Sequence, residues 1–205
     1  DLYSAVLKRK SFHVFPKPER KLTLDEVVEI QQHIQTLVPL DPEIRTEITI
    51  VANNRTTLVR GQEYCIVMYS EKKDGYLQNL GYLGEQLDLW LTSKGIGVLW
   101  SGLGSAKEKK EGLEYVIMLA IGKMEEDRFR SDLSKVSRKA VTEIWSDELY
   151  TGIRDVVRYA PSAINMQPWY VQASEEQLTV YRRKETFRPK LLSDAMQIHY
   201  NQIDM

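Results

Sequence analysis

The chain has 205 residues, of which 42% are hydrophobic and 28% are charged, and its 28 basic residues almost balance its 29 acidic ones. This length and composition are typical of a globular protein and exclude collagen-like, mucin-like and wholly disordered classes. A net charge of −1 offers no overall attraction to nucleic acid or to anionic lipid, so we expect neither as a partner. The longest apolar run is far shorter than the roughly 20 residues that span a bilayer, so we expect no membrane segment.

The metal-ligating residue types are sparse. One cysteine, Cys65, and three scattered histidines provide neither an internal disulfide nor a cluster of zinc ligands. We therefore expect no metal site. A lone thiol, together with an N-terminal segment that does not resemble a signal peptide, favours a reducing and cytoplasmic location.

The first half of the chain predicts helices alternating with strands. Residues 23–26 have the spacing of a capping box and begin an apolar stripe at helical period, which we expect to continue to Val38 and to stop at Pro39. Alternation over residues 44–50 predicts a half-buried strand, and the apolar run 64–69 predicts a central strand.

A long helix is predicted over residues 77–91, where the small residue Gly84 would permit close packing and Gly95 would end the helix. Two further strands are expected at residues 98–102 and 115–121.

The second half predicts a similar succession of elements. A polar connecting segment at 131–137 comes first. An amphipathic helix follows, which is capped by 146–148, stopped by Pro161 and expected to turn Leu149, Ile153, Val156 and Val157 inward. Strands at 170–173 and 178–181 and a helix that starts at Ser193 complete this half. Because Met205 cuts this last pattern off abruptly, we expect the protein to continue beyond it.

The two halves share the order capped helix, proline, strand, loop, strand, helix. Pro39 and Pro161 lie 122 residues apart, and the strand residues Thr49 and Val171 lie the same distance apart. No residue identities support the match, so this order is compatible both with an internal duplication and with coincidence.

Three clusters of residues could bind a small ligand. Residues 8–13 place basic side chains beside a hydroxyl and an imidazole, which could surround one phosphate or simply form a solvated turn. Residues 160–169 combine two prolines with Ser, Asn and Gln between a helix and a strand, a density that favours a functional loop. Residues 95–102 contain three glycines, which would let backbone N–H groups approach a flat ligand closely. A tight connection between a helix and a strand would explain these glycines equally well.

Together these clusters resemble the FMN-dependent nitroreductase family. The family's N-terminal pattern of basic residues, Ser and Phe is similar to residues 9–15, its P-S-x-x-N-x-Q-P-W loop to residues 161–169, and its glycine segment to residues 95–102. The resemblance implies a nitroreductase-like α+β fold, in which helices flank a central and mainly antiparallel sheet.

Two departures from the family pattern matter. His13 stands where the family usually has Arg or Lys, which would make its phosphate contact weaker and pH-dependent. In ordinary members the P-S-x-x-N loop follows the first amphipathic helix, but here it follows the second. In those members FMN lies between two subunits, one of which supplies the basic segment and the other the loop. The resemblance therefore implies a fused pseudo-dimer with one FMN site. It would be a single domain over residues 1–205, built from two repeats at about 1–125 and 126–205. This pseudo-dimer would be monomeric or would self-associate.

Carried over by position, the resemblance implies a complete set of FMN contacts. The phosphate would be held by Arg9, Lys10, Ser11 and His13, with Arg138 as a later basic contact. The flavin ring would lie along Pro161, Ser162, Ala163, Asn165 and Gln167. The segment Leu99, Trp100, Ser101 and Gly102 would present backbone to the ring, with an N–H of Ser101 or Gly102 near N5.

The activity implied by the resemblance is a ping-pong oxidoreduction. NAD(P)H passes a hydride to flavin N5, and a nitroaromatic, a quinone or a similar small-molecule electron acceptor then takes its place. No side chain is expected to be an obligatory acid or base, because the cofactor carries the chemistry. Other flavin chemistry on this fold remains an alternative (dehalogenation, flavin destruction or deazaflavin-linked reduction), as does a non-enzymatic flavin-binding module.

We predict that Arg9→Ala weakens FMN binding about ten- to a hundredfold, because a charge-assisted phosphate contact is worth roughly 1.5–3 kcal/mol. Titration of the apoprotein with FMN, followed by flavin fluorescence, measures this change. An unchanged affinity would place the phosphate elsewhere.

Overall fold

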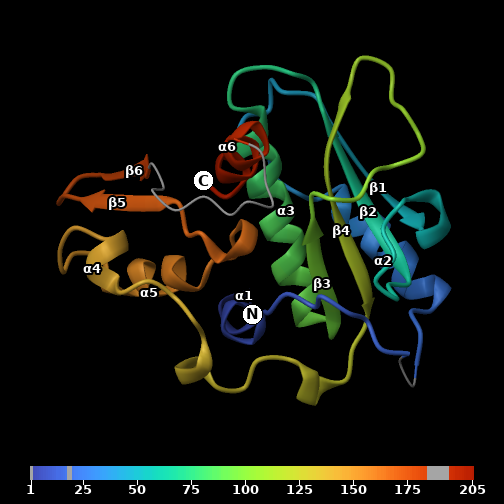
Figure 1. The fold of residues 1–205 in the computed structure, drawn as a ribbon, viewed down its shortest axis with the longest axis horizontal. Coiled ribbons are helices and arrows are strands. Elements are labelled where there is room, and N and C mark those ends of the chain that lie inside the picture. Colours follow the sequence, from blue (N-terminus) through green and yellow to red (C-terminus); the bar gives the residue numbers. More distant parts are fainter. Residues whose placement is uncertain (1, 18–19, 184–193) are drawn as a thin grey trace. The chain divides into compact units, whose positions relative to one another are not determined.

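The computed structural model describes residues 2–17, 20–183 and 194–205 and divides the chain into two compact units (Figure 1). The first unit is Asp1–Ser131 and the second is Asp132–Met205. Each described unit has its own cluster of buried hydrophobic side chains. The boundary lies close to the one expected near residue 125, and the relation of the two units as repeats stays a prediction.

The first unit is an antiparallel sheet with helices. Its strands follow the order β1-β2-β4-β3, and every neighbouring pair is antiparallel. This confirms the expected α+β fold with a central antiparallel sheet. The elements are α1 (Leu2–Lys8), α2 (Leu24–Ile34), β1 (Thr46–Ala52), η1 (Asn53–Arg55), β2 (Tyr64–Ser70), α3 (Tyr76–Ser93), β3 (Ile96–Ser101), β4 (Glu114–Lys123) and η2 (Glu126–Arg128).

The two inner strands, β2 and β4, are buried on both faces. A strand that is covered on both sides gains from apolar residues at every position, which explains the continuous apolar runs in the sequence. The outer strand β1 is only half-buried along its length, and its sequence alternates accordingly.

The long helix α3 packs against β2 and β3 (Figure 1). A Cβ at Gly84 would overlap the ring of Trp100 in β3, so the absence of a side chain lets this helix approach the sheet closely. Gly95 follows the helix with φ of +70°, a left-handed conformation that ends helices and costs glycine little. Both expectations for this helix are confirmed.

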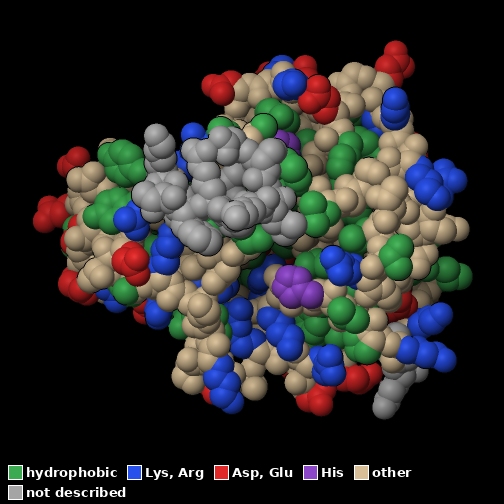
Figure 2. Space-filling model, in the orientation of Figure 1, with side chains coloured by type: hydrophobic (Ala, Val, Ile, Leu, Met, Phe, Trp, Pro, Cys, Tyr) green, Lys and Arg blue, Asp and Glu red, His purple; other side chains and the backbone are tan. Residues whose placement is uncertain are grey.

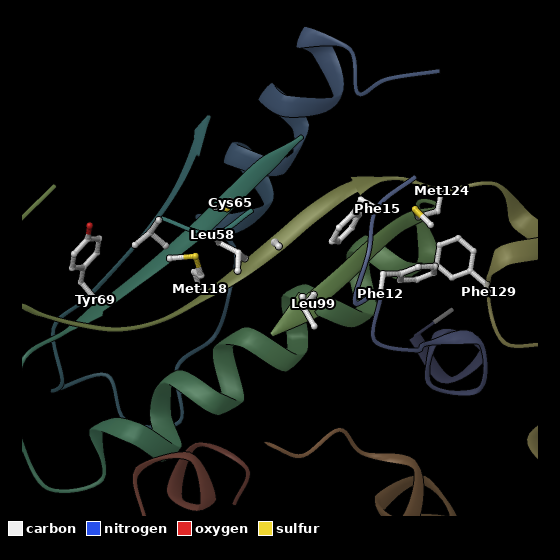
Figure 3. Close-up of a cluster of buried hydrophobic side chains, with 11 residues drawn as sticks. Phe12, Phe15, Leu58, Cys65, Tyr69, Leu99, Met118, Met124 and Phe129 are labelled. Atoms are coloured by element: carbon white, nitrogen blue, oxygen red, sulfur yellow. The ribbon is translucent and has the colours of Figure 1, made fainter. Parts of the chain in front are cut away.

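The opposite face of the sheet carries a cluster of buried hydrophobic side chains, in which Figure 3 shows Phe12, Met124 and Phe129 at one end and Tyr69 at the other. The rings of Phe12 and Phe129 meet edge to face with 5.3 Å between centroids. The backbone N–H of Phe12 also donates to the carbonyl of Val98 at 3.0 Å. The N-terminal basic segment is therefore attached to β3 by the backbone of Phe12 and to Phe129 by the Phe12 ring.

The capping box of α2 is confirmed, but the predicted end of this helix was wrong. The Thr23 side chain accepts from the Glu26 N–H while the Glu26 carboxylate accepts from the Thr23 N–H. The helix ends at Ile34 instead of Val38. Gln86 explains the difference, since its side chain accepts from the Val38 N–H at 3.2 Å and donates to the Val38 carbonyl at 2.8 Å, satisfying a backbone that has left the helix.

The second unit contains a two-stranded antiparallel sheet and short helices. Both expected strands are confirmed, and the start expected at Ser193 for the last helix lies outside the described residues. The elements are η3 (Leu133–Lys135), α4 (Val141–Ile144), α5 (Thr151–Tyr159), η4 (Ala163–Asn165), β5 (Trp169–Ala173), β6 (Leu178–Arg182) and α6 (Asp194–Ile203). The buried cluster is formed by Ile144, Trp145, Trp169, Val171 and Ala173.

The predicted cap of α5 was wrong. Residues 146–148 form a turn before the helix, in which Asp147 accepts from the Leu149 N–H at 2.7 Å, and the N-cap is Tyr150 with φ of 55°. The predicted inward residues are also less buried than expected, since Ile153 is 48% exposed and no residue of this helix is buried. A unit this small has little interior, so an amphipathic pattern does not ensure burial.

The surface charges, the helices and the possible metal ligands of the described residues can each be compared with the sequence. Figure 2 shows acidic and basic side chains spread over the drawn face. In the part of the chain that the structure describes, no helix combines the length and apolarity needed to cross a bilayer. Within the same residues, His, Cys, Asp and Glu side chains form no group of three or more that could hold a metal ion.

We predict that Gly97→Ala lowers the free energy of unfolding by about 1–3 kcal/mol, as overpacking does. A Cβ there would lie 2.5 Å from Met124 Cγ and 2.8 Å from Phe12 Cδ2. Gly152→Ala is the matched control, because none of the described residues lies within 4 Å of its Cβ position and alanine favours a helix. Urea unfolding followed by circular dichroism compares them, and equal losses in both variants would contradict the packing argument.

Candidate functional site

The predicted phosphate contact Arg9 is buried, with 2% of its surface exposed. Its Nε donates to Oδ2 of Asp88 at 2.8 Å, and Asp88, in α3, is fully buried. Burial by itself would lower the pKa of Arg9, but the carboxylates of Asp88 and Glu85 outweigh it and raise that pKa. Arg9 is therefore held as a cation inside the first unit.

Asp88 also holds Trp100, one of the residues expected to line the flavin. The indole Nε1 of Trp100 donates to the same Oδ2 atom at 2.7 Å, and the Thr92 hydroxyl donates to the other oxygen, Oδ1, at 3.5 Å. One buried carboxylate thus fixes an arginine that follows α1 and a tryptophan of β3.

One donor of this arrangement is left over. The Nη2 atom of Arg9 is buried and has no hydrogen-bond partner in the described part of the chain. The next residue, Lys10, lies near Arg128 and Arg130. Burial and these two like charges lower the pKa of Lys10, and the nearby Asp127 offsets this lowering only in part. The surroundings of this segment are rich in positive charge, and an anion would satisfy the buried donor.

The other predicted residues of the first unit take up different positions. Ser11 pairs with Val98 in an isolated parallel bridge, and His13 is exposed. The side chain of Leu99 belongs to the buried hydrophobic cluster, and its backbone is part of the β3–β4 ladder opposite Ala120. Ser101 is buried and Gly102 is half-buried at the end of β3.

The second unit brings Arg138 together with the proline-bounded loop. Its Nη1 donates to Oδ1 of Asn165 at 2.9 Å and its Nη2 donates to the carbonyl of Tyr159 at 3.2 Å. Asn165 in turn donates through Nδ2 to the carbonyl of Ser137 at 3.1 Å. The amide of Gln167 accepts from the Lys139 N–H at 2.8 Å and donates to the Asn165 carbonyl at 3.1 Å.

The backbone of this loop is strained. Ile164, Asn165 and Gln167 have φ angles of 48°, 60° and 49°. These angles lie in the left-handed region, which residues other than Gly and Asn rarely occupy. Ser162 supports the turn, because its hydroxyl accepts from the Gln167 N–H at 2.9 Å. Strain of this kind persists only where surrounding contacts over-determine the conformation, and it clusters at functional sites.

A carboxylate of the C-terminal segment also contacts the loop. Asp204 Oδ2 accepts from the backbone N–H of Ala163 at 2.9 Å. Burial raises the pKa of Asp204 to about 7, although the Ala163 hydrogen bond acts in the opposite direction. This group therefore titrates near neutral pH beside a predicted flavin contact.

The structure thus brings some of the predicted residues together in two sets. In the first unit Arg9 and Trp100 are joined through Asp88. In the second unit hydrogen bonds join the loop residues and their neighbours, namely Arg138, Ser162, Ala163, Asn165 and Gln167. Two residues of these sets were missed by the sequence reasoning, Asp88 and Asp204. A signal for Asp88 was available, because it lies four residues after Gly84 on the apolar stripe of α3, where a carboxylate indicates a buried ion pair. No comparable signal marked Asp204.

Solved structures similar to this chain are nitroreductases by their descriptions. A "putative nitroreductase" from Thermotoga maritima matches 98% of this chain and 83% of its own, with a TM-score of 0.63 and 22% identity. A nitroreductase family protein from Clostridium difficile 630 matches 71% of this chain and 97% of its own, with a TM-score of 0.54 and 11% identity. An FMN-dependent nitroreductase from Clostridium difficile R20291 matches 66% and 94%, with a TM-score of 0.50 and 14% identity. These likenesses show a nitroreductase-like fold.

The family is shown by a second comparison. The family described as "Putative TM nitroreductase" matches residues 1–205, the whole chain. The chain therefore belongs to this nitroreductase family, and the resemblance seen in its sequence motifs is confirmed. A search of the curated proteins found no match.

We predict that Asp204→Asn makes the stability of the protein less dependent on pH. The folded state holds a proton on Asp204 up to about pH 7, while the unfolded chain releases it near the ordinary value of 3.8. The contribution of this group to the unfolding free energy therefore falls as pH rises between these values and is lost above the folded pKa.

Urea unfolding at several values from about pH 5 to about pH 8 measures the difference. The wild type should lose more stability across this range than Asp204→Asn, whose amide oxygen can still accept from Ala163. Parallel curves for the two proteins would show that Asp204 is not protonated in the folded state.

Proposed function

We propose that the chain is an FMN-dependent oxidoreductase that takes hydride from NAD(P)H and reduces a nitroaromatic, a quinone or a similar small acceptor. Membership of the nitroreductase family supports an oxidoreductase. The FMN-dependent nitroreductase of the same fold from Clostridium difficile R20291 supports the choice of flavin.

The observation that carries this proposal is the buried Nη2 of Arg9, which has no partner among residues 2–17, 20–183 and 194–205. A buried charged donor without an acceptor is costly, and the phosphate of FMN is an acceptor of the right charge. Lys10, with Arg128 and Arg130 nearby, adds the positive surroundings that a dianion needs. Ser11 and His13 lie in the same short segment and complete the proposed phosphate contacts.

The strained loop of the second unit suits the flavin ring. Its backbone is fixed by Ser162, Gln167 and Arg138 before any ligand binds, so little ordering cost is incurred on binding. Pro161, Ala163 and Asn165 offer short side chains and backbone to a flat ring. The backbone at Ser101 and Gly102 supplies the proposed contact near N5.

When bound, FMN supplies hydride acceptance and hydride donation. The residues of this chain bind the phosphate, orient the ring and hold charge in place, and we assign no side chain a proton transfer. The proposed partner is a small electron acceptor. A fused pseudo-dimer that is monomeric or self-associates, and a cytoplasmic location, remain parts of the proposal.

We predict that the purified protein binds FMN, and that NADH or NADPH bleaches the visible flavin absorption under anaerobic conditions. Addition of a nitroaromatic or a quinone should restore the colour, and a protein-free mixture of FMN and nicotinamide is the control. A protein that takes up no FMN contradicts the proposal. Tight FMN binding without bleaching would instead favour a flavin-binding module, and reoxidation by neither acceptor would favour other flavin chemistry.

A further inference from the structure

The carboxylate of Asp88 has a role that the proposed FMN contacts leave unexplained. It is fully buried in α3 and lies 79 residues from Arg9 in the sequence. Its oxygen Oδ2 accepts from both Arg9 Nε and Trp100 Nε1, at 2.8 and 2.7 Å.

This double contact restricts how the guanidinium of Arg9 can lie. The group is planar and its donors point in fixed directions, so an acceptor at Nε fixes the direction of that donor and leaves the Nη atoms for another partner. The Asp88 carboxylate is itself held in place, since Trp100 and Thr92 also donate to it. Arg9 is thereby held with its Nη2 buried and unpartnered.

Stability alone does not account for this pair. A buried ion pair often contributes no more than well-packed apolar residues of the same volume, because removing both charges from water is costly. Here the pair is incomplete as well, since one buried donor stays unsatisfied. An arrangement that is unfavourable without a ligand and complete with one indicates preorganisation for binding.

We propose that Asp88 is a positioning residue, which orients the Arg9 guanidinium for the phosphate of the flavin and fixes the Trp100 indole beside it. This inference rests on the proposed function, because it needs FMN at Arg9. Asp88 itself contacts neither phosphate nor ring in this proposal.

Because Asp88 is negatively charged, the direction in which its removal changes phosphate affinity tests the proposal. If this carboxylate acted only through its charge, its removal would strengthen the binding of an anionic phosphate. If it positions Arg9, its removal weakens phosphate binding although a negative charge has been lost. The effect should be absent for riboflavin, which has the same ring system and no phosphate.

The experiment compares FMN and riboflavin dissociation constants for the wild type, Asp88→Asn and Glu85→Gln, measured by flavin fluorescence. Glu85→Gln is the matched control, because Glu85 lies in the same helix and acts on Arg9 by charge. We expect Asp88→Asn to reduce the preference for FMN over riboflavin about tenfold or more. Glu85→Gln should keep or increase this preference.

Several outcomes would overturn the inference. These are an unchanged or stronger FMN preference in Asp88→Asn, an equal loss of both flavins, an equal loss of preference in Glu85→Gln, or a wild type that binds FMN no better than riboflavin. The last result would leave FMN binding itself intact, whereas a wild type that binds neither flavin would remove the proposed function as well.

A measurement on the wild type decides the question if Asp88→Asn does not fold. The Arg9 side-chain N–H signals can be assigned in ¹⁵N spectra by their loss in Arg9→Lys. We expect the Nε–H signal to be protected from exchange without flavin, and the Nη signals to shift with FMN but not with riboflavin. Rapid exchange at Nε, or the same Nη response to both flavins, would overturn the positioning role.

Discussion

The buried carboxylate of Asp88 is the interaction on which the arrangement of the first unit depends. It joins α3 to Arg9, which follows α1, and to Trp100 in β3. Such a group is stable away from water only if its charge is balanced and its oxygens accept hydrogen bonds, and both conditions are met here. The helix, the strand and the basic segment are therefore fixed by one acceptor, and the fold and the candidate site share the same constraint.

The second unit also holds its candidate residues in place by hydrogen bonds, here without a buried ion pair of the Arg9–Asp88 kind among its described residues. Its loop holds three side-chain-bearing residues at positive φ. Hydrogen bonds donated by Arg138 and Lys139, and one accepted by the Ser162 hydroxyl, keep them there. The cost of the backbone strain is met by contacts around the loop, and the result is a shape that exists before a ligand binds. Both units thus present groups that the fold holds in place, which suits the proposed FMN cofactor.

Local physics explains which parts of the fold could be predicted from the sequence. Apolar runs in β2 and β4, the capping box of α2 and the glycine after α3 act over a few residues, and all of these predictions are confirmed. The predictions failed where distant contacts decide. Gln86 holds the backbone of Val38 outside the helix expected there, and a left-handed Tyr150 caps α5 in place of the serine and acidic residues before it.

The candidate site divides along the same line. By itself the sequence determined the family, because the basic segment and the proline-bounded loop are contiguous motifs whose residue types and spacing can be read directly, and the family match over residues 1–205 agrees. Only the tertiary structure decided that Arg9 is buried against a carboxylate 79 residues away, with one donor left over. The physical reason is that a charge pair between distant residues depends on which helix faces and strands meet, and that is a property of the packed fold.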